Sequence, residues 1–132
     1  ILDNYIKSNN LLSKVKILPF KKNPYKYIAL ADIFLFTSIY EGLPNVLLEA
    51  QCLKKYIIST DCPTGPKEIL LNGKVGELVP ILDYREVSKK IVKYDKTKKN
   101  KKIRLGYSNL NRFDYEYNIN KYFKVIKKFI YL

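Results

Sequence analysis

The chain has 132 residues, of which 47% are hydrophobic and 28% charged. This size and composition are typical of one soluble globular domain and exclude a disordered chain. The sequence has no His and only two cysteines, which excludes a His-based catalytic triad, a zinc site and a disulfide framework, and predicts reduced cytosolic thiols. It shows neither an apolar run long enough to cross a bilayer nor a signal peptide. The absence of Met, even at position 1, predicts a piece of a longer chain.

The net charge of +13 is unevenly distributed along the sequence. Residues 1–80 hold 10 Lys and Arg against 7 Asp and Glu, whereas residues 81–132 hold 15 against 5. A basic excess of this kind indicates an anionic neighbour, which could be membrane lipid, nucleic acid or a phosphorylated substrate. The alternative is a solvated Lys-rich surface that binds nothing.

Short apolar runs alternate with helix-like segments over the first 80 residues. We expect four strands, at residues 15–18, 33–36, 56–59 and 75–79. We expect two helices between them, at residues 25–31 and from Pro44 to about residue 53. Asn23 is the predicted N-cap of the first helix, with Pro24 at its first position. The continuously apolar run at residues 33–36 predicts a buried parallel strand.

The pattern after Asp83 is helical only. We expect a helix at residues 84–94, a polar Lys-rich stretch at residues 95–102, and a long final helix. In that final helix apolar residues recur every three or four positions between Ile119 and Ile130, opposite four lysines. The whole sequence therefore predicts an α/β fold, with a Rossmann-like parallel sheet covered by helices on both faces. Residues 84–132 would form a helical, Lys-rich C-terminal region.

The stretch at residues 38–50 (SIYEGLPNVLLEA) follows a predicted strand and opens a helix. Ligands of open α/β sheets bind at this place. Gly42 has no side chain to keep a ligand from the backbone. With Pro44 in the first turn, the N–H groups from Asn45 onward are free, and together with the helix dipole they favour an anion such as a diphosphate.

Two carboxylates bracket this predicted anion site, Glu41 before the helix and Glu49 in its second turn. A carboxylate accepts hydrogen bonds from two neighbouring hydroxyl groups at once, which suits a sugar. One Glu on each side of a diphosphate could hold two sugars, the hexose to be transferred and the ribose of a nucleotide. The alternative is an unremarkable pair, one acid in a loop and one on a helix surface.

The segment from Glu41 to Glu49 resembles the E-x7-E motif of glycosyltransferase family 4, the "group 1" retaining enzymes with the GT-B fold. The resemblance covers residues 11–83. It includes the strand and loop at residues 15–25, Ala31-Asp32 with the following strand, and residues 59–69 and 72–80.

The resemblance implies roles for individual residues. Glu41 and Glu49 are the candidate catalytic residues: Glu41 would contact hydroxyls of the donor hexose, and Glu49 the ribose hydroxyls. The remaining donor-binding residues would line the diphosphate through the backbone or face the base. They are Gly42, Leu43, Pro44 and Asn45 at the diphosphate, and Pro19 and Phe20 at the base.

The loop at residues 62–68 would close one side of the sugar pocket. An equally open interpretation is a turn stiffened by Pro and Gly.

Two parts of the family pattern have no counterpart in this sequence. The first two strands of the family's C-terminal domain, which carry an Arg and a Lys for the diphosphate, are absent. The acceptor-binding N-terminal domain is absent too. The resemblance therefore implies a partial nucleotide-sugar-binding domain over residues 1–132, inactive by itself and dependent on a missing N-terminal domain.

The implied reaction transfers a hexose or N-acetylhexosamine from a nucleotide diphosphate sugar, most simply a UDP-sugar, with retention. The acceptor would be a glycan or a lipid-linked glycan. No metal and no cofactor are expected. The enzyme would be cytoplasmic and attached peripherally to the inner face of the plasma membrane through lysines at residues 89–102. Two alternatives remain: a basic nucleic-acid-binding module, and a GT-B epimerase of nucleotide sugars.

Overall fold

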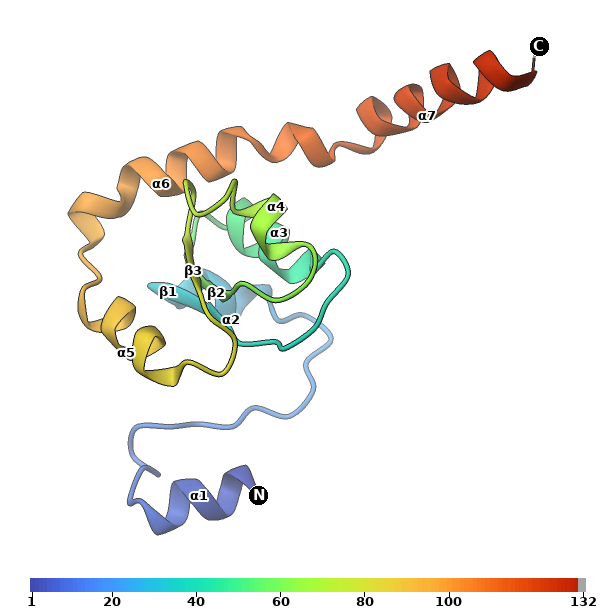
Figure 1. The fold of residues 1–132 in the computed structure, drawn as a ribbon. Helices are drawn as coiled ribbons and strands as arrows, with labels where there is room; N and C mark the ends of the chain where they lie inside the picture. Colours follow the sequence, from blue (N-terminus) through green and yellow to red (C-terminus); the bar gives the residue numbers. More distant parts are fainter. Residues whose placement is uncertain (131–132) are drawn as a thin grey trace.

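The computed structural model describes residues 1–130, apart from the side chains of Lys96, Lys98 and Lys99. Its centre is a parallel sheet with the strand order β1-β2-β3 (Figure 1). The strands are β1 (Ile33–Phe36), β2 (Tyr56–Thr60) and β3 (Glu77–Val79). In register, Leu35 lies beside Ile58, and Ile58 beside Glu77. Because the strands are parallel, the loops after all three strands emerge at one carboxyl edge.

Seven α-helices and one short 3-10 helix complete the described part of the chain. They are α1 (Leu2–Ser8), α2 (Tyr25–Leu30), α3 (Asn45–Cys52), α4 (Pro66–Ile69), α5 (Tyr84–Val92), α6 (Lys96–Ser108), η1 (Leu110–Phe113) and α7 (Tyr115–Ile130). The predicted strands at residues 33–36 and 56–59 and the helices at residues 25–31 and 44–53 are confirmed, with ends shifted by one or two residues. The fourth strand is shorter than predicted.

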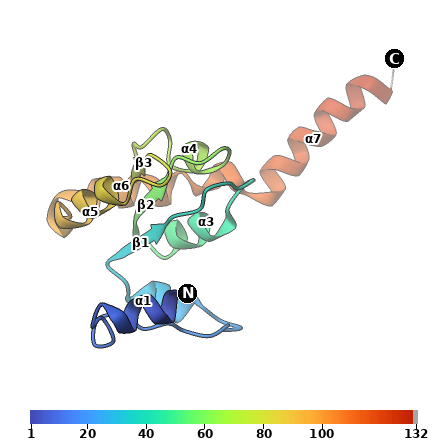
Figure 2. The same ribbon diagram turned by 60° about the horizontal axis from the view of Figure 1, so that its bottom comes forward.

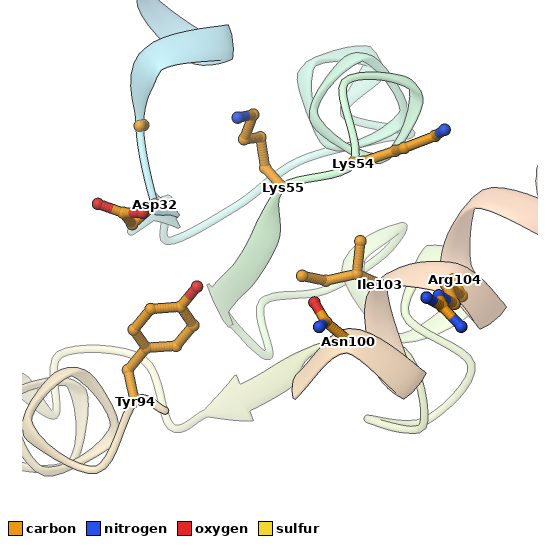
Figure 3. Close-up of a pocket in the computed structure, with 8 residues that line it drawn as sticks. Asp32, Lys54, Lys55, Tyr94, Asn100, Ile103 and Arg104 are labelled. Atoms are coloured by element: carbon orange, nitrogen blue, oxygen red, sulfur yellow. The ribbon is translucent and has the colours of Figure 1, made fainter. Parts of the chain in front are cut away.

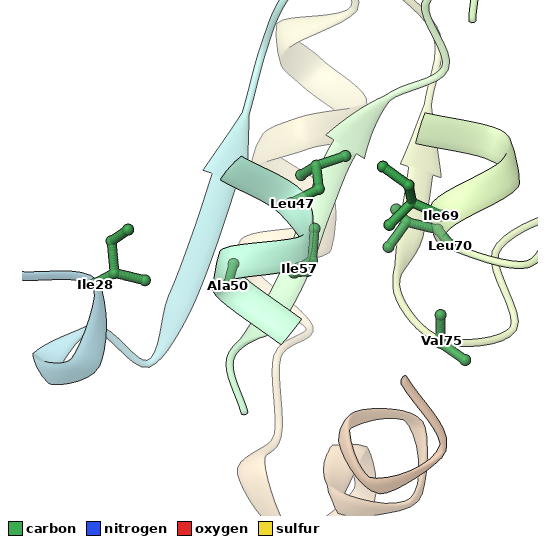
Figure 4. Packing of buried hydrophobic residues seen from close by; sticks show 7 residues of the cluster. All are labelled: Ile28, Leu47, Ala50, Ile57, Ile69, Leu70 and Val75. Atoms are coloured by element: carbon green, nitrogen blue, oxygen red, sulfur yellow. The ribbon is translucent and has the colours of Figure 1, made fainter. Parts of the chain in front are cut away.

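Both faces of the sheet are covered, as the sequence predicts. On one face Ile57 is buried with Leu47 and Ala50 of α3 and with Ile69 and Leu70 (Figure 4). On the opposite face Tyr56, Ile58 and Val79 are buried, with side chains of α5 and α6 packed against them. Successive residues of a strand point to opposite faces, so the continuous apolar run of β2 supplies both clusters.

The predicted strand at residues 15–18 is wrong. This segment has no regular structure, and Val15, Ile17 and Leu18 are each at least 40% exposed. A strand needs a neighbour for its backbone hydrogen bonds. Among the described residues β1 pairs only with β2, so nothing at that edge of the sheet holds residues 15–18 extended.

The same open edge explains why β1 is less buried than its apolar sequence predicts, since Leu35 is 41% exposed. The expected cap of α2 is also one residue off. Pro24 is the N-cap, while the Asn23 side chain accepts a hydrogen bond from the N–H of Tyr25 at 3.1 Å.

The Lys-rich stretch at residues 95–102 is not an irregular linker but the first half of α6. The Asp95 side chain accepts a hydrogen bond from the N–H of Thr97 and caps this helix. The cap and the packing of Ile103 against the sheet outweigh the repulsion among the lysines. The side chains of Lys96, Lys98 and Lys99, three of the predicted lipid-binding lysines, lie outside the described residues.

The final helix is confirmed as α7, and it extends away from the sheet (Figures 1 and 2). The apolar face of an amphipathic helix usually packs against protein, but no residue of α7 is buried against the described chain. Residues 131 and 132 of the predicted C-terminal region lie outside the described residues.

A network of polar side chains connects α5 and α6 to the amino edge of the sheet. The carboxylate of Glu77, only 13% exposed, pairs with Lys102 of α6 at 2.8 Å and with Lys90 of α5 at 3.1 Å. It also accepts a hydrogen bond from the hydroxyl of buried Tyr56. Burial and this hydrogen bond to Glu77 raise the pKa of Tyr56 well above its usual value.

Candidate functional site

The loop after β1 is held by the loop after β2. The N–H of Glu41 donates to the carbonyl of Pro63 at 3.1 Å. The Thr64 hydroxyl donates to the carbonyl of Glu41 at 2.8 Å and lies 3.2 Å from that of Gly42. Two loops from neighbouring strands therefore form one unit at the carboxyl edge, which fixes the backbone ahead of α3.

Gly65 allows this close approach. Its φ of +87° lies in the region that favours glycine, and a Cβ there would overlap the carbonyl oxygen of Gly42 and the ring of Pro44. From the sequence, residues 62–68 could be either a ligand-closing loop or a stiffened turn. The structure shows at least that they support the loop at residues 41–44.

Gly42 differs from Gly65 in its surroundings. A Cβ at Gly42 would meet no protein atom within 4 Å, so the space over this residue is open. Pro44 is buried and is the N-cap of α3, and no side chain caps the helix. Within residues 1–130, the N–H groups of Gly42, Leu43 and Asn45 donate to no protein acceptor. Three unused donors therefore lie in the loop that borders this open space and in the first turn of a helix, where an anion binds favourably.

The two predicted catalytic carboxylates lie on either side of Asn45 in the chain. Glu41 is half-buried in the loop at residues 41–44, which Pro63 and Thr64 hold in place, and Glu49 is half-buried in the second turn of α3. The hydroxyl of Tyr25, at the start of α2, donates to the Glu49 carboxylate at 3.4 Å. The place of Tyr25 directly after Asn23-Pro24 predicts a helix start, but nothing in the sequence predicts its hydrogen bond to Glu49.

The structure does not bring Phe20 into contact with this site. Phe20 is 93% exposed and Pro19 is exposed, both in the segment without a strand. Their assignment to the base side of the donor stays a prediction.

A cavity of about 480 Å³ lies beside the α3 N-terminus. Leu43 and two residues of α3, Asn45 and Leu48, form one wall, and the rest comes from α4, η1 and α7. Its lining residues are Leu43, Asn45, Leu48, Glu68, Arg112, Phe113, Asn118 and Tyr122. Neither Glu41 nor Glu49 lines it, and no feature of the sequence indicates that η1 and α7 reach this edge.

A smaller pocket of about 240 Å³ lies at the opposite, amino edge of the sheet. Figure 3 shows Asp32 and Tyr94 on one side of it and Lys54 and Arg104 on the other. Lys55 donates a hydrogen bond to the carbonyl of Ala29, and the Lys54 ammonium lies 4.6 Å from the centre of the Tyr107 ring. None of the predicted site residues lies here.

No group of three or more His, Cys, Asp or Glu side chains is arranged to hold a metal ion in the described part of the chain. No helix within residues 1–130 is long and apolar enough to cross a membrane.

A parallel sheet with helices on both faces and a polar loop at its carboxyl edge defines the class of α/β proteins that bind ligands at that edge. The family follows from the sequence match. Residues 2–112 match the family described as "Glycosyl transferases group 1", and the chain belongs to this family. This membership favours the transferase interpretation over a nucleic-acid-binding module.

Curated relatives agree with this assignment. The chain is 46% identical over 69 residues to an uncharacterized glycosyltransferase of Methanocaldococcus jannaschii, covering 52% of this chain and 17% of that protein. It is 40% identical over 76 residues to a Campylobacter jejuni protein, N-acetylgalactosamine-N,N'-diacetylbacillosaminyl-diphospho-undecaprenol 4-alpha-N-acetylgalactosaminyltransferase. That match covers 58% of this chain and 21% of the relative. The chain thus spans about a fifth of the length of these relatives.

Solved structures share the fold. A crystal structure of TarM superposes with a TM-score of 0.84 at 20% identity, covering 93% of this chain and 25% of that one. Sucrose-phosphate synthase of Thermosynechococcus elongatus superposes with a TM-score of 0.82 at 18% identity, covering 98% and 33%. The predicted fold class is confirmed: the chain has the α/β architecture of GT-B glycosyltransferases.

Proposed function

We propose that this chain binds the nucleotide diphosphate sugar of a retaining glycosyltransferase of family 4. The observation that carries the proposal is the open space over Gly42, surrounded by unused N–H groups at the start of α3. The diphosphate would lie there, with Glu41 at the hexose hydroxyls and Glu49 at the ribose. Because charge grows on the departing diphosphate, donors fixed in place before the reaction stabilise the transition state.

The fixed position of the loop at residues 41–44 supports this role, because an N–H group stabilises the transition state best when it is already in place. The Thr64 hydroxyl holds the carbonyl groups of Glu41 and Gly42. The N–H groups of Gly42 and Leu43 remain available to a ligand. The Tyr25 hydroxyl restrains Glu49 in the same way. A hydroxyl that donates to one carboxylate oxygen leaves the other available for the ribose.

The N–H groups of Gly42, Leu43 and Asn45 form the proposed diphosphate cradle. It is tested by calorimetric titration of the chain with UDP and with UMP. We expect UDP to bind at least about tenfold more tightly than UMP, because the second phosphate adds charge-assisted hydrogen bonds to the free N–H groups. Equal affinities for UDP and UMP would show that the diphosphate does not bind at the α3 N-terminus.

We further propose that the donor is a UDP-linked hexose or N-acetylhexosamine and that the acceptor is a glycan or lipid-linked glycan. The Campylobacter jejuni relative supports this, since its name describes transfer of N-acetylgalactosamine to a diphospho-undecaprenol-linked sugar. Retention is tested by NMR assignment of the anomeric configuration in donor and product, with an enzyme that also contains the acceptor-binding N-terminal domain. An inverted product would contradict it.

A lipid-linked acceptor fits a cytoplasmic enzyme held at an anionic membrane surface. Lys93, the C-cap of α5, and Lys101 of α6 are exposed and support this part of the proposal, whereas Lys89 pairs with Glu86 at 3.4 Å. Lys90 and Lys102 were also predicted to face lipid, but both pair with Glu77 in the structure, so we leave them out of the lipid-facing set. Co-sedimentation with anionic vesicles should fall as salt rises, and binding that ignores lipid charge would contradict the electrostatic attachment.

A further inference from the structure

We infer that the 480 Å³ cavity beside the α3 N-terminus is a subsite for a neutral sugar residue of the acceptor, built in part by η1 and α7. The inference rests on the proposed function and deepens it, since it assigns acceptor binding to this chain as well as donor binding. It stands on three features: the polar groups that have no partner, the balance of charge, and the position beside the donor loop.

The cavity contains hydrogen-bonding groups of both kinds that are unused within the described residues. The side chains of Asn45 and Glu68 make no hydrogen bond or ion pair there. Arg112 donates from Nε to the carbonyl of Asn109 and from Nη2 to the carbonyls of Glu68 and Ile69, which leaves Nη1 free. A carboxylate that accepts and a guanidinium that donates, both held near an amide, match the neighbouring hydroxyl groups of a pyranose.

The guanidinium of Arg112 is fixed before any ligand arrives. Its three hydrogen bonds run to the backbone of two different segments, and its carbon lies 4.9 Å from the centre of the Phe113 ring. Asn118 is fixed too, since its amide nitrogen donates to the carbonyls of Arg112 and Asp114, both at 2.8 Å. Its side-chain oxygen remains as a further acceptor. Such preorganised polar groups lose little freedom when a ligand binds.

Charge and shape favour a neutral sugar over a phosphate. Among the lining residues one Arg and one Glu balance each other, so the cavity has no net charge to attract an anion. Phe113 and Tyr122 supply aromatic surface, and aromatic rings pack well against the apolar C–H face of a sugar. The volume lies within the range of about 300–1,000 Å³ that small-molecule sites occupy.

The position of the cavity matches the requirement of transfer. Leu43 and Asn45 belong both to its wall and to the proposed diphosphate cradle. An acceptor hydroxyl has to lie about 3–3.5 Å from the carbon it attacks, so acceptor and donor must bind on adjoining surfaces. The cavity adjoins the donor loop at the proposed diphosphate site, whereas Glu41, proposed at the hexose, does not line it.

The test is saturation-transfer NMR on the 132-residue chain, with UDP and with the methyl α-glycosides of galactose, glucose and N-acetylgalactosamine as probes. We expect at least one methyl glycoside to bind and UDP not to displace it. Tyr122→Ala should lower the glycoside signal about fivefold, the effect of losing an aromatic contact, and Glu68→Gln should lower it too. Neither change should affect the UDP signal.

Matched controls separate a local effect from a general one. Tyr115→Ala removes a tyrosine from the same helix, 73% exposed against 67% for Tyr122, and should leave both signals unchanged. Glu116→Gln serves the same purpose for Glu68. The inference is overturned if no glycoside binds while UDP does, if UDP displaces the glycoside, or if Tyr122→Ala and Glu68→Gln leave the glycoside signal unchanged. A chain that binds neither probe would overturn the proposed function as well.

Discussion

The two edges of the sheet use polar side chains in opposite ways. At the amino edge Glu77 accepts from Tyr56, Lys90 and Lys102, which join β2, β3, α5 and α6. At the carboxyl edge the free N–H groups around Gly42 and Asn45 contact no protein acceptor within the described residues. Polar groups that satisfy one another stabilise the fold, whereas polar groups held in place without partners are available to a ligand.

The largest effect that sharpens this comparison is expected from Gly65→Ala. The substitution places a side chain at positive φ and against the backbone of Gly42, and we expect it to cost about 3 kcal/mol of unfolding free energy. The matched change Gly42→Ala fills open space and should leave stability within about 0.5 kcal/mol, while weakening UDP binding. Denaturant titration of both variants measures this. Equal stability losses would show that the two glycines do not have these separate roles.

Glu77→Gln should have the next largest effect on stability. It leaves two ammonium groups and the Tyr56 hydroxyl without their shared carboxylate. Because Lys90 and Lys102 are each about 30% exposed, we expect a loss of about 2–3 kcal/mol, below the value for a fully buried pair. Denaturant unfolding measures the loss, with Glu116→Gln as an exposed control. If Glu77→Gln lost most of its UDP binding while it was still folded, the amino edge would contribute to ligand binding, which would contradict the separate roles of the two edges.

Alkaline pH should weaken the amino edge through Tyr56. Its pKa is raised in the folded chain by burial and by Glu77, so above pH 10 the unfolded chain releases this proton while the folded chain keeps it. The unfolding free energy contributed here is fully present below pH 10 and is lost as pH rises beyond it. Stability measured between pH 9 and pH 11 should fall less steeply in Tyr56→Phe. Parallel curves would show that Tyr56 does not contribute to the pH dependence.

The smallest effect is expected from Tyr25→Phe. This variant removes the hydroxyl that donates to Glu49 at 3.4 Å, a long hydrogen bond between exposed groups. We expect UDP affinity to fall about two- to threefold, with stability unchanged. Calorimetry on this variant and on Tyr115→Phe as a control tests the point, and a change as large as that in a Glu49 variant would mean that Tyr25 itself contacts the ligand.

How much the sequence predicts depends on whether the cause of a structure is local. The strands β1 and β2 and the helix α3 follow from apolar runs and from Pro44, all readable from neighbouring residues. The segment at residues 15–18 has the composition of a strand, but a strand also needs a partner, which its own residues do not specify. The first half of α6 was likewise not predicted as a helix, because its many lysines do not indicate one and its start depends on the Asp95 cap.

The candidate site shows the same limit. Glu41, Gly42 and Glu49 were identifiable because they lie within nine residues of one another. Arg112 and Tyr122 line a cavity with Leu43 only because η1 packs beside α3 and the first turns of α7 follow η1 there, and nothing in their local sequence indicates this. The contrast between Gly42 and Gly65 was also invisible, because it depends on what each glycine meets in space.

The most direct test of the central claim is calorimetric titration of UDP into the chain and its Glu49→Gln variant. Glu49 is proposed to hold the ribose, and a neutral amide is a weaker acceptor for a hydroxyl pair than a carboxylate. We predict at least about tenfold weaker binding in Glu49→Gln and no change in the Glu116→Gln control, with both variants as stable as the original chain. Equal UDP affinity in all three proteins would contradict the assignment of the carboxyl edge as the nucleotide-sugar site.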